Sequence, residues 1–318
     1  MSLAGEFFGA HDSNDRLSIT SAEALWDWVL TGGADRLTAE RWPLSPGVNL
    51  FFRGQPNVEY GLPSSLYRLC RTQRSGPEPG PSSRIDERVL EVAERAIVAA
   101  MRAEGIGRNM TDGELLAVLQ HHGIPTRLVD VSKAPLEALF FAIDQEHSAD
   151  GRLFMLHIHP DVTGQVDTIA FADKDTLEWE NTAHGTLRTK ADWTERVALV
   201  DQAPLDARMR AQGGRFLVGG LNKRYAGQTY KVGTKHVPAD QFAEISTLSI
   251  NFLRSTMGKL NAHWQATGWT VRVESTWKPE LLQRLGSVGI SHDTMYPPLG
   301  EVRRLALSVA KGAVTEHD

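Results

Sequence analysis

The segment 116–142 constrains the fold most strongly, because polar residues interrupt an otherwise apolar sequence at points where the secondary structure is expected to change. Thr111 is expected to begin a helix that ends at Gly123, since glycine readily adopts a positive φ angle. Pro135 is expected to begin a second helix, which is apolar almost all round and therefore buried. A short strand, 126–131, is expected between the two helices. The polar residues at these junctions are His121, His122, Thr126, Arg127 and Asp130.

Composition places the chain among ordinary globular proteins. Its 318 residues are 41% hydrophobic and 23% charged, which is enough to build a full core. The net charge of −5 and the pI near 6.1 give no global basic field for nucleic acid or an anionic membrane. The single cysteine, Cys70, excludes an internal disulfide and a cysteine-based metal cluster. No apolar run is long enough to cross a bilayer, and the N-terminus lacks the apolar core of a signal peptide, so we expect a cytoplasmic protein with no membrane partner.

Helices and strands are predicted to alternate irregularly, which favours an α+β fold over a regular βαβ winding. We therefore predict a small mixed sheet surrounded by several helices in a single compact domain, residues 18–312. Residues 1–17 and 313–318 are predicted to be tails, and the polar segments 72–84 and 219–240 are predicted to be surface loops. Apolar periodicity further predicts strands at 48–53, 152–159 and 269–273, and helices at 85–104, 247–265 and 301–310.

The predicted strand 48–53 ends in a charged residue, Arg53, directly before the turn-forming residues 54–56. A charge at the end of a buried strand needs a partner, because burying it alone is costly. Ser64 and Ser65 follow shortly afterwards. We interpret them as helix caps, since no Gly-x-Ser-x-Gly elbow surrounds them.

Histidines are numerous, yet no metal site is expected. His157 and His159 share one face of a predicted strand, but no acidic third ligand lies in the motif. No His-x-Glu or His-Glu-x-x-His pattern is present, so metal-dependent hydrolysis is a weak alternative. A Ser-His-Asp hydrolase using Ser64 or Ser65 would require long-range assembly that the sequence does not show.

Several blocks of sequence, taken together, resemble a known family. They are Phe-Arg-Gly-Gln at 52–55, Pro-Ser-Ser-Leu-Tyr-Arg at 63–68 and Gln-His-His-Gly-Ile-Pro-Thr-Arg-Leu-Val-Asp at 120–130. These blocks resemble the FRG domain, which is named after its Phe-Arg-Gly motif. Arg208 with 212–216, and the segment 278–290, look like later blocks of the same family. The resemblance implies a setting in bacterial and phage proteins, linked to conflict systems such as phage defence, and no established chemistry.

Two departures from the family pattern bear on function. Val131 stands where the family usually has tryptophan, although the preceding acid and the following hydroxyl are kept. The segment 296–301 lacks both carboxylates of the family's Phe-Pro-Asp-Leu-Asp-Gly pattern. If those carboxylates are catalytic in relatives, Glu301 would have to replace them here.

The first hypothesis is an enzyme similar to arginine-type ADP-ribosyltransferases, with NAD as substrate and a protein or nucleic acid as acceptor. In those enzymes an aromatic-Arg-Gly motif at a strand end holds the dinucleotide phosphates, which suits the planar, permanently charged guanidinium of Arg53. A glutamate is also needed to stabilise the oxocarbenium-like state. The candidate catalytic residues are Glu274, Glu301 and His121. The candidate binding residues are Arg53, Gly54, Gln55, Ser65, His122, Thr126, Arg127, Asp130, Arg208 and Gln212. The hypothesis predicts that Arg53, His121, Arg127 and Glu274 converge on one cleft.

Two other interpretations remain open. A non-catalytic module could use Arg53, Arg127 and Arg208 to bind a nucleotide-like, phosphate-bearing small molecule or an acidic segment of a partner protein. Alternatively, Arg53 with Asp130, and Arg127 with another carboxylate, could simply be buried ion pairs.

Overall fold

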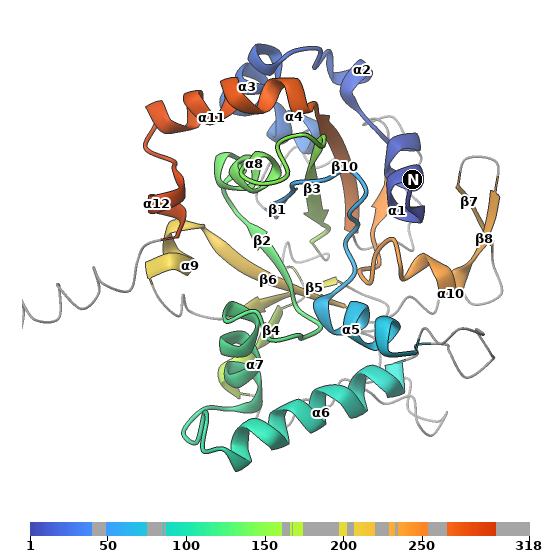
Figure 1. Cartoon of the computed structure of the whole chain (residues 1–318), viewed down its shortest axis with the longest axis vertical. Coiled ribbons are helices and arrows are strands. Elements are labelled where there is room, and N and C mark those ends of the chain that lie inside the picture. The colour runs from blue at the N-terminus through green and yellow to red at the C-terminus, as the bar shows by residue number, and fades with distance from the viewer. Residues whose placement is uncertain are drawn as a thin grey trace, which may run out of the picture.

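The computed structural model describes residues 1–39, 49–74, 85, 87–160, 166, 168–173, 197–201, 207–219, 229–232, 235–253 and 266–296. Its centre is an eight-stranded sheet with the strand order β4-β5-β6-β2-β1-β3-β10-β9 (Figure 1). Neighbouring strands are antiparallel except for the pairs β4–β5 and β9–β10. The strands are β1 Leu50–Gln55, β2 Val129–Ser132, β3 Gly151–Ile158, β4 Thr168–Ala170, β5 Val197–Asp201, β6 Gly214–Gly219, β9 Asn251–Phe252 and β10 Ala266–Val273.

Helices cover both faces of this sheet and complete a single compact α+β domain, so the predicted fold class is confirmed. In chain order, the helices are α1 Leu3–Ala10, α2 Asn14–Leu17, α3 Ala22–Leu30, α4 Gly33–Ala39, α5 Ser65–Arg74, α6 Glu87–Ala103, α7 Asp112–His121, α8 Pro135–Ile143, α9 Ala207–Ala211, α10 Ala239–Phe242, α11 Lys278–Ser287 and α12 His292–Met295. Among the described helices, none combines the length and the apolar content needed to cross a membrane.

Alternating side chains of the central strands supply the core on each side of the sheet. Phe52 and Trp269 belong to the apolar cluster that packs against α3, α8 and α11. Phe51 and Phe154 point to the other side and pack with Phe8 of α1. The alternation along β1 follows from the two-residue period of a strand.

Local sequence signals set the ends of the elements around the centre of the chain. Thr111 caps α7 together with Glu114 in a capping box, and Gly123 follows the helix with φ of 76°. Pro135 occupies the first turn of α8. The predicted helix 85–104 is confirmed as α6.

Gly54 allows α8 to lie directly on β1. A β carbon at this position would lie 1.9 Å from the carbonyl oxygen of Ala138 and 2.5 Å from the amide nitrogen of Ala142. Both distances are far below van der Waals contact, so no other residue fits without moving the helix. Gly54, one of the candidate binding residues, therefore makes room for α8.

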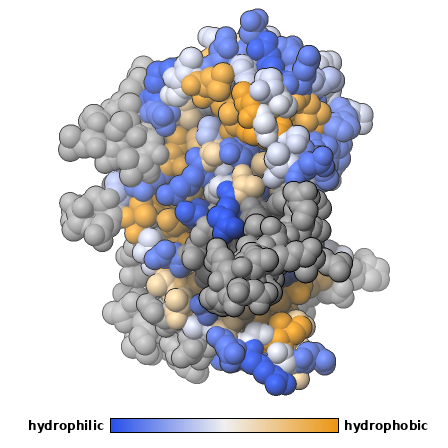
Figure 2. Space-filling model, turned by 90° about the vertical axis from the view of Figure 1, so that its left-hand side faces the viewer, coloured by the Kyte–Doolittle hydropathy of each residue, from blue (hydrophilic) through white to orange (hydrophobic). Residues whose placement is uncertain are grey.

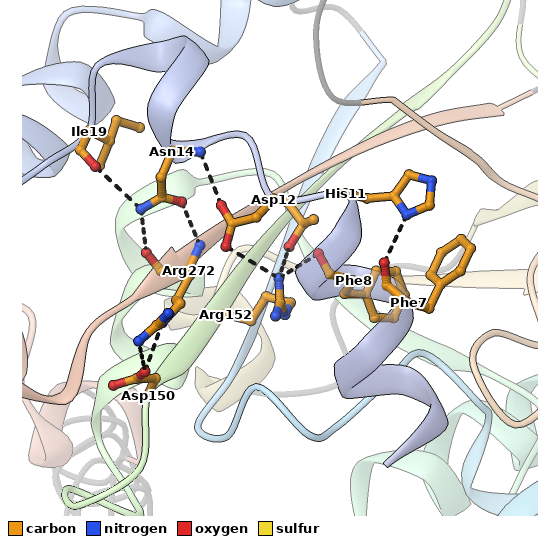
Figure 3. A network of polar contacts seen from close by, with 10 residues as sticks. Phe7, Phe8, His11, Asp12, Asn14, Ile19, Asp150, Arg152 and Arg272 are labelled. Atoms are coloured by element: carbon orange, nitrogen blue, oxygen red, sulfur yellow. Dashed lines mark hydrogen bonds and ion pairs between the residues drawn. The ribbon is translucent and has the colours of Figure 1, made fainter. Parts of the chain in front are cut away.

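Residues 1–17 were predicted to be a tail, and this prediction is wrong. They form α1 and α2, which pack against the sheet (Figure 1). Phe8 is fully buried, and its ring meets the ring of Phe154 at 4.8 Å. Arg152, which lies on β3, donates a 3.2 Å hydrogen bond to the carbonyl oxygen of Phe8 (Figure 3). Asn14 bonds both main-chain groups of Arg272 on β10. The prediction failed because the sequence does not show that a sheet face is available to these aromatic residues.

Two other segments differ from the prediction. Within the predicted loop 219–240, residues Thr229–Val232 and Lys235–Pro238 form the antiparallel strands β7 and β8. The described part of the predicted helix 247–265 is not helical and contains the short strand β9. Residues 72–74 of the predicted loop 72–84 are helical and end α5, and residues 75–84 lie outside the described residues. The predicted helix 301–310 and the tail 313–318 also lie outside them.

Candidate functional site

A cavity of about 570 Å³ lies where β1 and β2 separate. The two strands are paired at Phe52 and Ser132, after which β1 continues beside β3 alone. The wall of the cavity contains residues of β1, the end of α7, β2, α8, the turn between α9 and β6, and Tyr296 after α12. Polar and apolar surfaces alternate on the side of the molecule where α11 and α12 lie (Figure 2). Of the polar residues expected at the junctions, His121, His122 and Asp130 line this cavity.

Arg53 lies in this cavity with its charge incompletely neutralised. Its Nη1 donates a 2.5 Å hydrogen bond to the main-chain oxygen of Asp130, while the nearest carboxylate oxygen of Asp130 is 3.7 Å away. Its Nε is buried and has no hydrogen-bond partner among the described residues. Desolvation lowers the pKa of Arg53 from its ordinary value, and the charge of Asp130 opposes that shift. A desolvated cation of this kind gains from an added anion.

A chain of hydrogen bonds orients Asp130. The side-chain amide of Gln120 donates to the Asp130 carboxylate at 2.6 Å, and the hydroxyl of Thr126 donates to the Gln120 carbonyl at 2.7 Å. Ser65 accepts from the Thr126 amide and donates to its carbonyl, both at 3.1 Å. Gln120 and Asp130 line the cavity, whereas Ser65 and Thr126 lie behind them. Ser65 and Thr126 therefore support the wall from behind and are not part of the cavity lining.

The other walls combine polar groups with aromatic rings. His121 and His122 end α7 at the cavity, with ring centroids 5.4 Å apart. Across the cavity, the Gln212 amide donates to the carbonyl oxygen of Met295 at 2.9 Å. The rings of Phe141 and Tyr296 meet edge to face at 6.1 Å. Arg215 supplies a second guanidinium to the lining.

Gly54 and Gln55 also belong to the lining, but for structural reasons. Gly54 accommodates α8, as described above. The side chain of Gln55 is buried and donates a 3.0 Å hydrogen bond to the carbonyl oxygen of Gly61. Of the Arg-Gly-Gln segment, Arg53 is the residue whose side chain is suited to bind a ligand.

Arg127 does not line the cavity. It is 2% exposed and forms ion pairs with Glu87 at 2.8 Å and with Glu94 at 3.1 Å, both on α6. This arrangement corresponds to the buried ion pair that we considered as the structural alternative. Burial raises the pKa of Glu94 to about 6, although the charge of Arg127 opposes the shift. The carboxylates that pair with Arg127 lie on α6, so nothing in the 120–130 motif itself indicated this role for Arg127.

Glu274, the first of the two candidate glutamates, does not line the cavity. Glu274 follows β10, which is separated from β1 by β3, and it lies next to Thr276 at 3.5 Å. The expected convergence of Arg127 and Glu274 with Arg53 and His121 is therefore wrong. Glu301 and the side chain of Arg208 lie outside the described residues.

Sequence reasoning gave no ligand-facing role to four residues that line the cavity. Gln120 stands in the Gln-His-His motif, which was its only signal, and Arg215 stands in the glycine-rich segment before β6. Phe141 belongs to a helix that is apolar almost all round, so no amphipathic pattern distinguishes its outward face. Tyr296 reaches the cavity by tertiary packing.

No group of three potential metal ligands lies close together in the described ranges. His157 is buried, and His159 contacts the hydroxyl of Thr267 at 2.7 Å.

The comparisons with known proteins identify one family. The FRG domain model matches residues 48–151, which begin just before β1 and end at the start of β3. No curated protein and no solved structure matched the chain. The later segments that resemble the family, 208–216 and 278–290, lie beyond the matched range, although 212–216 contributes to the same cavity. The matched range contains Arg53, Gln120, both histidines and Asp130, so the chain contains an FRG domain over residues 48–151, and the candidate site is built mainly from that domain.

Proposed function

We propose that the cavity binds a phosphate-bearing nucleotide, with Arg53 at the phosphate groups. The observation that carries this proposal is the state of Arg53 within the cavity. One guanidinium nitrogen bonds a main-chain oxygen, the side chain keeps 21% of its surface exposed in the cavity lining, and the Asp130 carboxylate stays 3.7 Å away. A planar guanidinium presents paired N–H groups that match the oxygens of a phosphate. An arginine fully paired with a carboxylate would not be available in this way.

The rest of the cavity supports a nucleotide over a simple anion. A volume of about 570 Å³ lies within the range of small-molecule and cofactor sites. Phe141 and Tyr296 supply flat apolar surface suited to a base. His121, His122 and Gln212 supply groups that can bond ribose hydroxyls or an amide. A ligand with a phosphate, a sugar and a base fits this distribution.

For the reaction, we propose NAD as the nucleotide and transfer of ADP-ribose as the chemistry. The bond between C1′ of the ribose and the nicotinamide nitrogen breaks, and its electron pair leaves with nicotinamide. An oxygen or nitrogen of a protein or nucleic-acid acceptor then bonds C1′ and releases its proton to a base. A carboxylate must stabilise the oxocarbenium-like state. Asp130, which Gln120 holds beside Arg53, is the described carboxylate that supports this role best, and His121 could accept the proton.

A non-catalytic binding module is the second candidate. The observation that favours it is the engagement of Asp130, whose carboxylate already accepts a 2.6 Å hydrogen bond from Gln120 and lies near Arg53. A carboxylate held in this way could serve only to fix the arginine. The ligand would then be a phosphate-bearing molecule, or an acidic segment of a partner, that binds without turnover.

A thermal-shift series tests the proposed function. The protein is heated with NAD, ADP-ribose or inorganic pyrophosphate at up to millimolar concentration. A ligand at 100 times its Kd stabilises the folded state by about 2.7 kcal/mol, which gives a readily measured rise in Tm. We expect NAD and ADP-ribose to stabilise the protein more than pyrophosphate does. If none of the three raises the Tm, the proposed function is wrong.

Release of nicotinamide separates the two candidates. NAD is incubated with the protein and a cell lysate as a source of acceptors, and nicotinamide is measured by chromatography. Release that is lost in Asp130→Asn, with ADP-ribose binding retained, supports the enzyme. Binding of NAD without release under these conditions supports the module.

A further inference from the structure

Lys278, the first residue of α11, is fully buried, and its ammonium group donates three hydrogen bonds to main-chain oxygens. The acceptors are the carbonyl oxygens of Pro56 at 2.8 Å, Gln145 at 3.1 Å and Glu146 at 3.0 Å. An ammonium group has three donors, so each is used once. Pro56 follows β1, and Gln145 follows α8, and both line the cavity. Lys278 therefore joins two separate segments of the cavity wall from behind.

The position is unfavourable for a positive charge in other respects. Burial lowers the pKa of Lys278, while the carboxylates of Glu146 and Asp150 act against that shift. The first turn of a helix also disfavours cations, because its free N–H groups carry partial positive charge. An apolar residue of similar length would fill the same space without these penalties. A lysine donates hydrogen bonds to the three carbonyl oxygens, whereas an apolar residue would leave all three without these bonds.

A second set of contacts fixes one of the two segments. Glu146 adopts φ of 47°, a left-handed conformation that is rare for a residue other than glycine. Its carboxylate accepts hydrogen bonds from the Asn57 amide at 2.7 Å and from the Tyr60 hydroxyl at 2.6 Å. The chain after α8 is thus held in a strained shape by the chain after β1, and Lys278 bonds both. A strained backbone that persists in this way is held by its surroundings.

We propose that Lys278 is a positioning residue that fixes the separation of the Pro56 and Gln145 walls and thereby the width of the cavity. Loss of its ammonium group leaves three buried carbonyl oxygens facing one another, so the two segments are expected to move apart or admit water. The cavity then loses its fit to a ligand even though Arg53 remains in place. The link to ligand binding rests on the proposed function, whereas the link to wall position does not.

Hydrogen exchange tests the wall position without any ligand. Val58, whose amide bonds the Asp150 carbonyl, and Ala149, whose amide bonds the Glu146 carbonyl, report on the two segments. The amides of Met155 on β3 and Trp269 on β10, which are paired in the sheet, report on the sheet itself. In Lys278→Met we expect exchange at Val58 and Ala149 to accelerate at least tenfold, with protection in the sheet retained. Unchanged exchange at both wall amides, or equal acceleration in the sheet, overturns the proposal.

Ligand binding provides a second readout with a chemical rescue. ADP-ribose affinity is expected to fall at least tenfold in Lys278→Ala and to recover with added n-propylammonium, which replaces the missing part of the side chain. The alcohol 1-propanol, of similar size, is the control and is expected to give no recovery. Equal recovery with both compounds would show that filling space is sufficient, which contradicts the role of the ammonium group. If the parent protein itself does not bind ADP-ribose, the proposed function fails while hydrogen exchange still decides the role of Lys278.

A milder substitution, Lys278→Gln, distinguishes a local effect on the cavity wall from a general failure to fold. Lys278→Gln keeps two N–H donors, so it is expected to fold and to give intermediate exchange at Val58 and Ala149. If Lys278→Met and Lys278→Gln both fail to fold, Lys278 supports the whole domain and the proposal of a local role is wrong.

Discussion

Glu94 provides a quantitative prediction about stability, because it is a buried acid whose pKa is raised mainly by desolvation. Its carboxylate lies 3.1 Å from Nε of Arg127, which is also paired with Glu87. Desolvation raises the pKa of Glu94 from 4.5 in the unfolded chain to about 6 in the folded protein. The folded state therefore binds this proton more tightly than the unfolded state.

The sign and size of the effect follow from this difference. Because the folded pKa is the higher one, the contribution is fully present below pH 4.5 and is lost as the pH rises through about 6. A difference of about 1.5 pKa units corresponds to about 2 kcal/mol, of which about 1 kcal/mol falls between pH 5 and pH 7. Lowering the pH from 7 to 5 is thus expected to stabilise the parent protein at this site.

Urea denaturation at pH 5, 6 and 7 measures the effect in the parent and in Glu94→Gln, which cannot titrate. Other titrating groups are common to both proteins and cancel in the difference. The parent is expected to gain about 1 kcal/mol relative to Glu94→Gln between pH 7 and pH 5. Glu91→Gln, on the same helix but outside the cluster, gives the effect of the same chemical change elsewhere. Parallel pH profiles for the parent and Glu94→Gln would refute the reasoning.

Three further changes test the packing by urea denaturation. Gly54→Ala is expected to reduce the free energy of unfolding by about 1–3 kcal/mol, because the new β carbon meets the Ala138 oxygen at 1.9 Å; an unchanged midpoint contradicts this. Arg127→Met removes the guanidinium that pairs with two buried carboxylates and is expected to lose about 3–5 kcal/mol at pH 7; a loss below 1 kcal/mol would contradict this role of the ion pairs. Deletion of residues 1–17 removes the fully buried Phe8 and is expected to reduce the free energy of unfolding by at least the roughly 3–5 kcal/mol that a Phe-to-Ala change costs. An unchanged free energy of unfolding would show that these residues are a tail.

The parts of the fold that were predictable from sequence depend on local signals. Thr111, Gly123 and Pro135 act through their own backbone and near neighbours, so the ends of α7 and the start of α8 could be placed from the sequence. The period of the apolar residues placed Arg53 on a strand, but the predicted end at Arg53 is wrong, because β1 continues to Gln55. These signals were sufficient to identify Arg53, His121, His122 and Asp130 as candidate residues, and all four line the cavity.

The errors depend on partners distant in the sequence. Arg53 and Arg127 look alike as single charges near polar motifs, but the carboxylates that bury Arg127 lie on α6, at Glu87 and Glu94. Glu274 was chosen because it ends a strand, yet the strand order places β3 between it and β1. The roles of Arg127 and Glu274 depend on contacts between residues distant in the sequence, and periodicity and motif spacing do not reveal such contacts.

The most direct test of the central claim compares ADP-ribose binding to Arg53→Met and Arg284→Met by isothermal titration calorimetry. Arg284 is a suitable control because it also pairs with a carboxylate, that of Glu280 at 2.7 Å, but lies outside the cavity. Hydrogen bonds to a charged group are worth about 1.5–3 kcal/mol, so loss of Arg53 is expected to weaken binding at least tenfold. Arg284→Met is expected to bind like the parent. Equal affinity of the parent and Arg53→Met would contradict the proposal that Arg53 binds the phosphate.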